Sequence, residues 1–408
     1  MAQKSEADVT RLSSCRQLLP AIVCHCWAVA AFASPRTRPI ALSGSSSAQS
    51  MRRVWHMEGV RVLSQDLDKR CADRVFIGAQ GRTILAIDLP SGRTLWKASD
   101  ALSATCEAWV DVSPDYVLVT SRESIAAYSP DTGEQMWARA PPCDSLSFAA
   151  KGGVAVGHCL PKSVCCGGID PGPFVALDVQ TGAELWRHSP EMGLFWDGLD
   201  GNRFFYIDNV RRPPPGPHRG HLVAVDLMSG RIVWRTPLDD AEGTLVVGEH
   251  TVVVLASFMT GFSKSDGKRL WRREPRSSAS EETVTSMGDR GAVVDDHLVL
   301  PGRRGFVPYA IDNGRPGRVI PYPSEWQSGP SRRNATLHSD GKVLFAWTRD
   351  TRSRIPSSIH AWKDRGWAEF ASLGDDWEIR AMHGDYVIVG AGDVLEAYML
   401  APSTAPRQ

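Results

Sequence analysis

One short phrase recurs along the chain and constrains the fold more than any other feature. An apolar run ending in Ala-x-Asp is followed by two residues, then Ser or Thr, then Gly, and Trp stands four residues after that Gly. Recurrence at a fixed period indicates a repeat architecture. Five readable copies and two flanking indoles provide the repeated positions Trp55, Asp88, Gly92, Trp96, Gly133, Trp137, Asp178, Gly182, Trp186, Asp226, Gly230, Trp234, Gly267, Trp271 and Trp367.

Each part of the phrase predicts a local structure. The apolar run forms a strand, the Asp accepts hydrogen bonds from turn amides, and the Gly provides the positive φ of a tight turn. The outgoing strand then carries a Trp whose broad face can be buried against a neighbouring unit. Because a lone hairpin cannot bury both of its faces, such units must stack. Successive Trp residues of the five copies stand 37 to 49 residues apart, a period that suits a four-stranded blade.

Two weaker copies and the chain ends complete the pattern. One copy runs from Ala310 to Gly317, with Val319 where Trp would stand, and the other ends at Trp367. Three strands without a fourth follow Trp367, whereas Trp55 has no hairpin before it. The strand around Trp55 is therefore predicted to complete the last blade, which closes the ring and removes free sheet edges. The predicted fold is an all-β, eight-bladed β-propeller of four-stranded antiparallel blades, with seven blades as the alternative.

The first fifty residues are predicted to lie outside this propeller. Residues 18–33 form an apolar stretch that ends in small residues, which is typical of a signal peptide. Acidic residues near the start, and Met51 where the repeats begin, leave the alternative that residues 1–50 are a mistaken start extension. The predicted organisation is a leader over 1–50, a propeller over 51–400 and a disordered tail over 401–408. A signal peptide at 18–33 implies a periplasmic or extracellular protein, whereas translation from Met51 implies a cytoplasmic one.

Charge and cysteine content exclude several classes of function. Lys and Arg number 46, as do Asp and Glu, so no overall charge attracts nucleic acid. Nine Cys residues are too few for a disulfide scaffold, and none has zinc-finger spacing. The apolar stretch at 18–33 is too short to span a bilayer. We expect a monomeric propeller without a transmembrane segment, a metal site or a nucleic-acid partner.

The five clear phrases resemble the repeat of pyrroloquinoline-quinone-like (PQQ-like) propellers, and the resemblance covers roughly residues 51–400. That superfamily includes quinoprotein alcohol dehydrogenases and the lipoprotein scaffold of the outer-membrane β-barrel assembly machine. The repeated residues build blades, so the resemblance implies fold more strongly than function. The predicted function is a non-catalytic scaffold for protein binding or assembly in the bacterial envelope. The alternatives are an oxidoreductase that binds PQQ and calcium over the propeller axis, and a sensor for a small ligand.

One feature is similar to the enzymes of that superfamily. Cys165 and Cys166 are adjacent, as in the vicinal disulfide of quinoprotein alcohol dehydrogenases. Adjacent cysteines also arise by chance, and the other interpretation is two loop thiols or partners for Cys143 and Cys159. No nucleophile elbow, zinc-protease motif or phosphate-binding loop occurs in the sequence. We predict no catalytic residues and no cofactor, with PQQ and calcium only under the enzymatic alternative.

The long loops on one face of the predicted ring are rich in arginine. They suggest a positive rim that favours an acidic protein partner. The competing interpretation is that these arginines are only solvated and that acidic residues balance their charge, namely Asp239, Asp240 and Glu242. The rim residues are Arg122, Arg211, Arg212, Arg219, Arg303, Arg304, Arg349, Arg352 and Arg354.

Three further indoles stand near the starts of predicted innermost strands, namely Trp109, Trp196 and Trp377. They would either line an axial funnel as platforms for a ligand or pack inside the blades.

Overall fold

The structure is a computed structural model of the chain, which divides into two compact units, Met1–Pro39 and Ile40–Gln408. All described residues belong to the second unit. The predicted leader and tail lie outside them. The described residues are 51–61, 74–79, 83–99, 108–113, 115–121, 124–142, 148–159, 172–190, 194–210, 219–239, 243–273, 291–302, 305–323, 335–339, 344–348, 357–363, 366–373, 378–383, 386–391 and 394–400.

Within these residues the strands form eight four-stranded antiparallel sheets, named blades 1 to 8 in chain order. In blades 1 to 7 four consecutive strands pair in sequence order. Blades 1 to 4 contain β2 (Val60–Arg61), β3 (Arg74–Ala79), β4 (Ile84–Asp88) and β5 (Thr94–Ala98); β6 (Ala108–Val112), β7 (Val117–Ser121), β8 (Ile125–Tyr128) and β9 (Gln135–Arg139); β10 (Phe148–Lys151), β11 (Val154–His158), β12 (Phe174–Asp178) and β13 (Glu184–His188); and β14 (Leu194–Asp200), β15 (Arg203–Val210), β16 (Arg219–Asp226) and β17 (Ile232–Leu238).

The remaining blades repeat this pattern, except that the last one recruits the first strand of the chain. Blades 5 to 8 contain β18 (Thr244–Val247), β19 (Thr251–Leu255), β20 (Met259–Ser263) and β21 (Arg269–Arg273); β22 (Ala292–Val294), β23 (His297–Pro301), β24 (Gly305–Ala310) and β25 (Ile320–Pro321); β26 (Ala335–Ser339), β27 (Leu344–Thr348), β28 (Ser357–Lys363) and β29 (Gly366–Leu373); and β30 (Glu378–His383), β31 (Tyr386–Ala391), β32 (Val394–Leu400) and β1 (Met51–Glu58).

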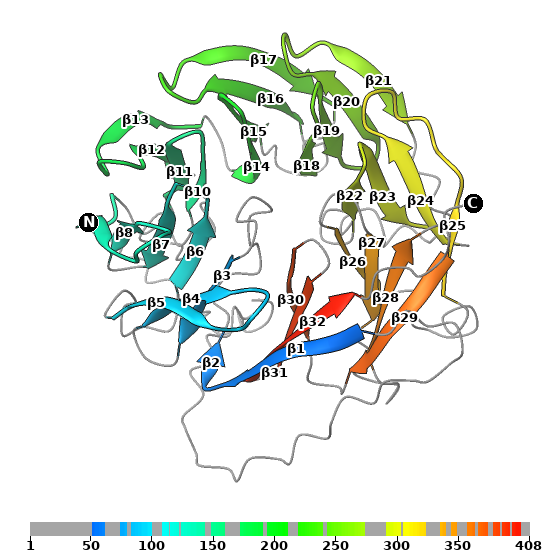
Figure 1. Cartoon of the computed structure of the whole chain (residues 1–408). Helices are drawn as coiled ribbons and strands as arrows, with labels where there is room; N and C mark the ends of the chain where they lie inside the picture. Colours follow the sequence, from blue (N-terminus) through cyan, green and yellow to red (C-terminus); the bar gives the residue numbers. More distant parts are fainter. Residues whose placement is uncertain are drawn as a thin grey trace, which may run out of the picture. The chain divides into compact units, whose positions relative to one another are not determined.

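The blades of this unit follow one another around a centre (Figure 1), and the strands on the inner side of blades 2 to 8 are β6, β10, β14, β18, β22, β26 and β30. Innermost strands of neighbouring blades touch, as β10 does β14 and β14 does β18, and β2 of blade 1 contacts β32 of blade 8. The predicted propeller of four-stranded antiparallel blades is confirmed. The sheet count agrees with the predicted eight and not with the alternative of seven.

At six junctions of the described ring, a repeated Trp joins one blade to the next. Its indole lies over the turn Gly of the following blade, and its Nε1 donates to the backbone carbonyl three residues before that Gly, at 2.6 to 3.1 Å. The Gly must be Gly for two reasons: its φ lies between 64° and 72°, and a Cβ would stand 2.4 to 2.7 Å from the indole. The pairs are Trp55 with Gly92, Trp96 with Gly133, Trp137 with Gly182, Trp186 with Gly230, Trp234 with Gly267, and Trp271 with Gly314.

The turn carboxylates have the predicted partners. Asp178 accepts the Thr181 amide at 2.8 Å, and Asp226 accepts the Ser229 amide at the same distance. Hydrogen bonds from Ser229 to the charged form lower the pKa of the Asp226 carboxyl.

Blade 6 departs from the predicted register. The turn Gly is Gly314, whose amide donates to the Ala310 carbonyl, and not Gly317 as the sequence pattern suggested. Val319 was expected to replace the Trp, yet 42% of its surface is exposed, so it provides no comparable wedge. The Gly314 amide donates to the Ala310 carbonyl as the Gly92 amide donates to the Asp88 carbonyl, so Ala310, and not Asp312, stands in the position of the turn Asp. The Asn313-Gly314 pair makes the tight turn, and the turn Gly therefore comes three residues earlier than the pattern suggested.

Apolar clusters fill the spaces between neighbouring blades. The cluster between blades 3 and 4 combines Phe174, Trp186, Phe204 and Tyr206. The rings of Phe174 and Phe204 meet edge to face with centroids 4.6 Å apart. The core is therefore a series of inter-blade layers, each of which depends on contacts between two sheets.

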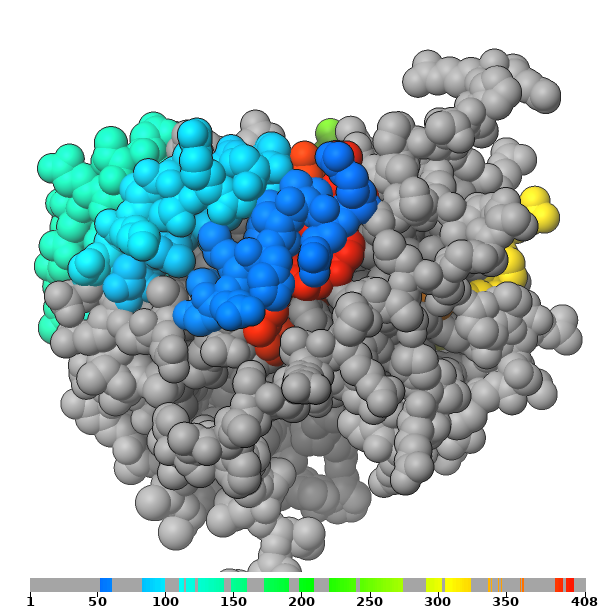
Figure 2. Space-filling model, turned by 60° about the horizontal axis from the view of Figure 1, so that its bottom comes forward, coloured from blue at the N-terminus to red at the C-terminus, as the bar shows by residue number. Residues whose placement is uncertain are grey.

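The ring closes through β1, which pairs antiparallel with β32 in the register Trp55 to Ala397. This confirms the predicted closure. Figure 2 shows the surface of β1, in blue, between the red of the C-terminal strands and the cyan of blade 1. The same contact appears in one cluster that joins Trp55 to Leu89 of blade 1 and Leu395 of blade 8.

A buried carboxylate ties the closing strand to its partner. Glu396 of β32 is 5% exposed and accepts hydrogen bonds from the Arg53 guanidinium at 3.0 Å and the Tyr398 hydroxyl at 2.5 Å. His56 Nδ1 lies 2.9 Å from Glu396 and His56 Nε2 lies 3.2 Å from Glu58. Hydrogen bonds to Glu58 and then to Glu396 raise the pKa of His56 above its usual 6.5.

The closure should therefore weaken as pH rises. His56 binds its proton more tightly in the folded state, so its contribution is complete below the unfolded pKa and is lost through the higher folded pKa. We expect the unfolding temperature to fall between pH 6 and 8.5 more steeply for the native chain than for His56→Gln. The effect is about 1 kcal/mol or less, since the His56 side chain is 37% exposed. Burial lowers the pKa of His158 and His188, which act with the opposite sign. Equal slopes for both chains would contradict this prediction.

Candidate functional site

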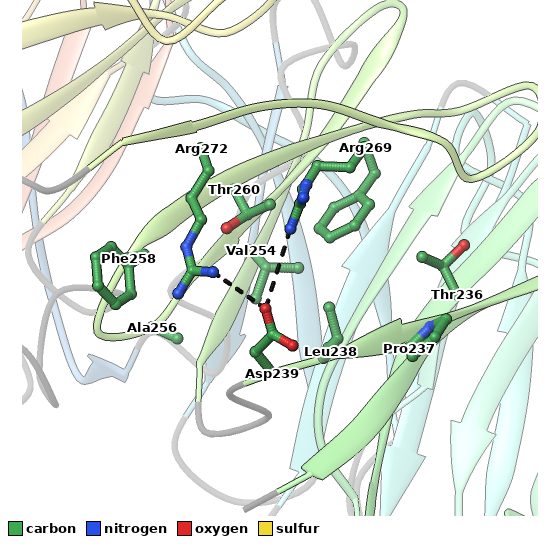
Figure 3. A pocket seen from close by; sticks show the side chains of 11 residues that line it. Thr236, Pro237, Leu238, Asp239, Val254, Ala256, Phe258, Thr260, Arg269 and Arg272 are labelled. Atoms are coloured by element: carbon green, nitrogen blue, oxygen red, sulfur yellow. Dashed lines mark hydrogen bonds and ion pairs between the residues drawn. The ribbon is translucent and has the colours of Figure 1, made fainter. Parts of the chain in front are cut away.

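A pocket of about 260 Å³ lies between the outer parts of blades 4 and 5 (Figure 3). Its deep walls are apolar, because Leu238, Val254, Ala256 and Phe262 are each less than 9% exposed. Charged side chains and one aromatic ring stand at its mouth. The lining residues are Thr236, Pro237, Leu238, Asp239, Val254, Ala256, Phe258, Thr260, Phe262, Arg269 and Arg272.

A β-bulge brings two arginines to the same side of this pocket. In the ladder between β20 and β21, Thr260 pairs with Arg272 and Phe262 with Arg269, although two residues rather than one stand between the arginines. The extra residue, Leu270, is the bulge. Strict alternation would place Arg269 and Arg272 on opposite faces, whereas the bulge turns both toward the pocket.

The two arginines share one carboxylate. Arg272 Nη1 donates to Asp239 Oδ2 at 3.0 Å, and Arg269 Nη1 lies 4.0 Å from the same oxygen. Arg272 also stands over the Phe258 ring, with Cζ 4.0 Å from the centroid, in a cation–π contact. Figure 3 shows both guanidinium groups directed at Asp239, which lies just beyond β17. The Asp239 side chain is 74% exposed, so its ion pairs are weak and exchangeable.

A second hollow at the same junction is occupied by structural contacts. Asp200 pairs with Lys264 and lies 3.5 Å from the ammonium of Lys151, which links blades 3, 4 and 5. Lys264 also donates to the Gly248 carbonyl at 2.8 Å, and only 15% of its side chain is exposed. These charges hold blades together and leave the Arg272 pocket as the better candidate for a ligand.

Most of the predicted site residues fall outside the described residues. This is true of Trp377, Cys165, Cys166, and every member of the arginine rim except Arg219, so the rim remains a prediction. Arg219 begins β16, where its backbone pairs with Val210. Trp109 lies in β6 and Trp196 in β14, the innermost strands of blades 2 and 4, with side chains that are not described.

Two predicted residues do receive a structural role. Asp239 was expected to balance the charge of arginines in the long loops, and it forms ion pairs with Arg269 and Arg272 of β21. Cys159 is buried and disulfide-bonded to a partner outside the described residues.

Sequence reasoning missed Phe258, Arg269 and Arg272. A usable signal exists, because the residue after the blade Trp is often basic. Arg187 holds this position in blade 3 and binds Glu184 of its own strand, and Arg235 holds it in blade 4 and binds Asp208 of the same blade. Arg272 instead reaches the preceding blade.

Among the described residues, no three His, Cys, Asp or Glu side chains group together as metal ligands would. The same part of the chain contains no helix with the length and apolar character of a membrane span.

Comparisons with known proteins agree on the architecture. The family model described as outer membrane protein assembly factor BamB matches residues 46–160 and 171–352. BamB of Burkholderia pseudomallei (strain K96243) is 26% identical over 230 residues, which are 53% of this chain and 55% of that protein. In these matches the chain spans just over half the length of its curated relatives.

Solved structures extend the similarity to the whole ring. BamB from Moraxella catarrhalis has a TM-score of 0.53 at 15% identity and covers 86% of this chain and 99% of that one. Quinohemoprotein alcohol dehydrogenase from Comamonas testosteroni has a TM-score of 0.53 at 11% identity, covering 88% and 78%. At such identities the structures show the fold alone, which BamB and the alcohol dehydrogenase both have. The family match covers most of the propeller, and the chain therefore belongs to the family described as outer membrane protein assembly factor BamB.

Proposed function

We propose that this eight-bladed propeller is a non-catalytic scaffold that binds proteins during outer-membrane protein assembly. The observation that carries the proposal is the family match, which runs from blade 1 into blade 7. The pocket favours binding over catalysis, because its charged groups are two arginines already paired with an exposed carboxylate. No cofactor is needed for this role, and an acidic segment of a protein partner would suit the positive mouth of the pocket.

We further propose that the chain works in the cell envelope after export by the segment at 18–33. The disulfide of Cys159 supports this location, since disulfides persist in oxidising compartments. N-terminal sequencing of the protein from envelope and cytosolic fractions tests it. A chain that starts at Met51 and is found in the cytosol would count against export.

Deleting the gene in the source organism tests the proposed function. We expect folded β-barrel proteins to decrease in the outer membrane, measured by their heat-modifiable mobility and by quantitative mass spectrometry, and to recover with the full chain. Unchanged β-barrel levels would refute the scaffold role. Turnover of an alcohol that depends on added PQQ and Ca²⁺ in a dye-linked assay would favour the enzymatic alternative.

A further inference from the structure

The pocket between blades 4 and 5 has the size of a site for one side chain. Its volume of about 260 Å³ is below the roughly 300–1,000 Å³ of small-molecule and cofactor sites. Leu238, Val254 and Phe262 provide a fully buried apolar wall, and Phe258, which is 36% exposed, extends it toward solvent. A large apolar side chain would complete this surface.

The positive charge at the mouth of the pocket favours a ligand that carries a carboxylate next to that apolar side chain. Among the described lining residues the charged ones are Arg269, Arg272 and Asp239, so two positive charges face one carboxylate there. A guanidinium presents two parallel N–H donors that match a carboxylate. Stacking on Phe258 holds the Arg272 guanidinium in place, which reduces the side-chain entropy lost on binding.

Asp239 already displays the interaction that a ligand would make. Its carboxylate accepts the Arg272 N–H at 3.0 Å while remaining 74% exposed. Weak, exposed pairing of this kind lets an incoming carboxylate exchange with it. We propose that this pocket binds an acidic peptide segment by taking one large apolar side chain into the cavity and an adjacent carboxylate onto Arg269 and Arg272. The proposal rests on the proposed protein-binding function and names the partner chemistry.

Peptide binding to the purified full chain tests the proposal. The probe is a fluorescein-labelled peptide, Gly-Ser-Asp-Phe-Asp-Ser-Gly, followed by fluorescence anisotropy at low salt. We expect Arg272→Ser to weaken binding about ten- to a hundredfold, the scale of a charge-assisted hydrogen bond. Asp239→Asn should tighten binding about two- to fivefold, because it removes the competing carboxylate.

Arg187→Ser is the matched control, since Arg187 also follows a blade Trp and its side chain is 40% exposed against 36% for Arg272. It should leave the affinity unchanged. Peptides with Asn in place of both Asp residues, or Ala in place of Phe, should lose most of their affinity.

Several outcomes would overturn the proposal. They are an absence of peptide binding, equal affinity of the native chain and Arg272→Ser, no tightening in Asp239→Asn, and displacement of the peptide by phosphate or anionic vesicles as readily as by unlabelled peptide. The failure of the pocket is distinguishable from that of the scaffold role. Peptide binding is measured on the purified chain, whereas β-barrel levels in the deletion strain do not depend on where the partner binds.

Discussion

Gly230→Ala will destabilise the protein by roughly 2–5 kcal/mol, of which the left-handed backbone accounts for about 1–2 and overpacking for about 1–3. A Cβ at this position would stand 2.6 Å from Cγ of Trp186. The indole cannot retreat easily, because its Nε1 donates to the Leu227 carbonyl at 2.7 Å and it packs against Phe204. Urea unfolding followed by Trp fluorescence measures the change.

Gly201→Ala provides the matched control within the same blade. Gly201 also has a positive φ, of 53°, but nothing lies within 4 Å of the position its Cβ would take. It should lose only the backbone contribution. If both variants unfold at the same urea concentration, the contact between indole and turn adds nothing to stability. Trp186→Ala, at about 3–5 kcal/mol, gives the scale for removing the wedge altogether.

A chain that begins at Gly59 will lose the closed ring. This truncation removes β1 and with it Trp55, which is 8% exposed and donates to the Leu89 carbonyl at 2.7 Å. Loss of one buried Trp costs about 3–5 kcal/mol, a large part of the roughly 5–15 kcal/mol by which domains are stable. It also leaves the edge of β32 unpaired, and free edges promote association between chains.

The control is a chain that begins at Met51, which keeps β1 and lacks residues 1–50. We expect it to be monomeric and to unfold at the temperature of the full chain. The chain from Gly59 should associate in light scattering and be cleaved faster by trypsin. Closure by β1 would be dispensable if the two truncated chains gave the same unfolding temperature and the same mass in solution.

Much of the fold could be predicted because each blade repeats its own local chemistry. The turn carboxylate, the positive-φ Gly and the Trp are all encoded within nine residues, as from Asp88 to Trp96. The three strands after Trp367 require a fourth. The prediction for the turn of blade 6 was wrong because the local chemistry changes there. The turn Gly is Gly314, and no Trp stands four residues after it. The displaced turn is visible in the backbone, where Gly314 has a φ of 64° and its amide donates to the Ala310 carbonyl.

The pocket was not predictable by the same reasoning. Period-two alternation assigns Arg269 and Arg272 to opposite faces, and only the bulge at Leu270 reverses this. Their partner Asp239 comes from another blade, 33 residues before Arg272. The sequence indicated that Asp239 balances the charge of arginines. It did not identify these arginines, because the partners of Asp239 depend on how two blades pack.

The pairing of β1 with β32 also determines when the ring can close during biosynthesis. Arg53 and Glu396, which meet across this ladder, are 343 residues apart in the chain. At about 5–20 residues per second, a ribosome needs on the order of tens of seconds to make the second after the first. Throughout that interval the earliest strand has no partner for its ladder. The first strand of the ring to be translated is thus among the last to pair, and the nascent propeller stays open until the C-terminal strands have been made.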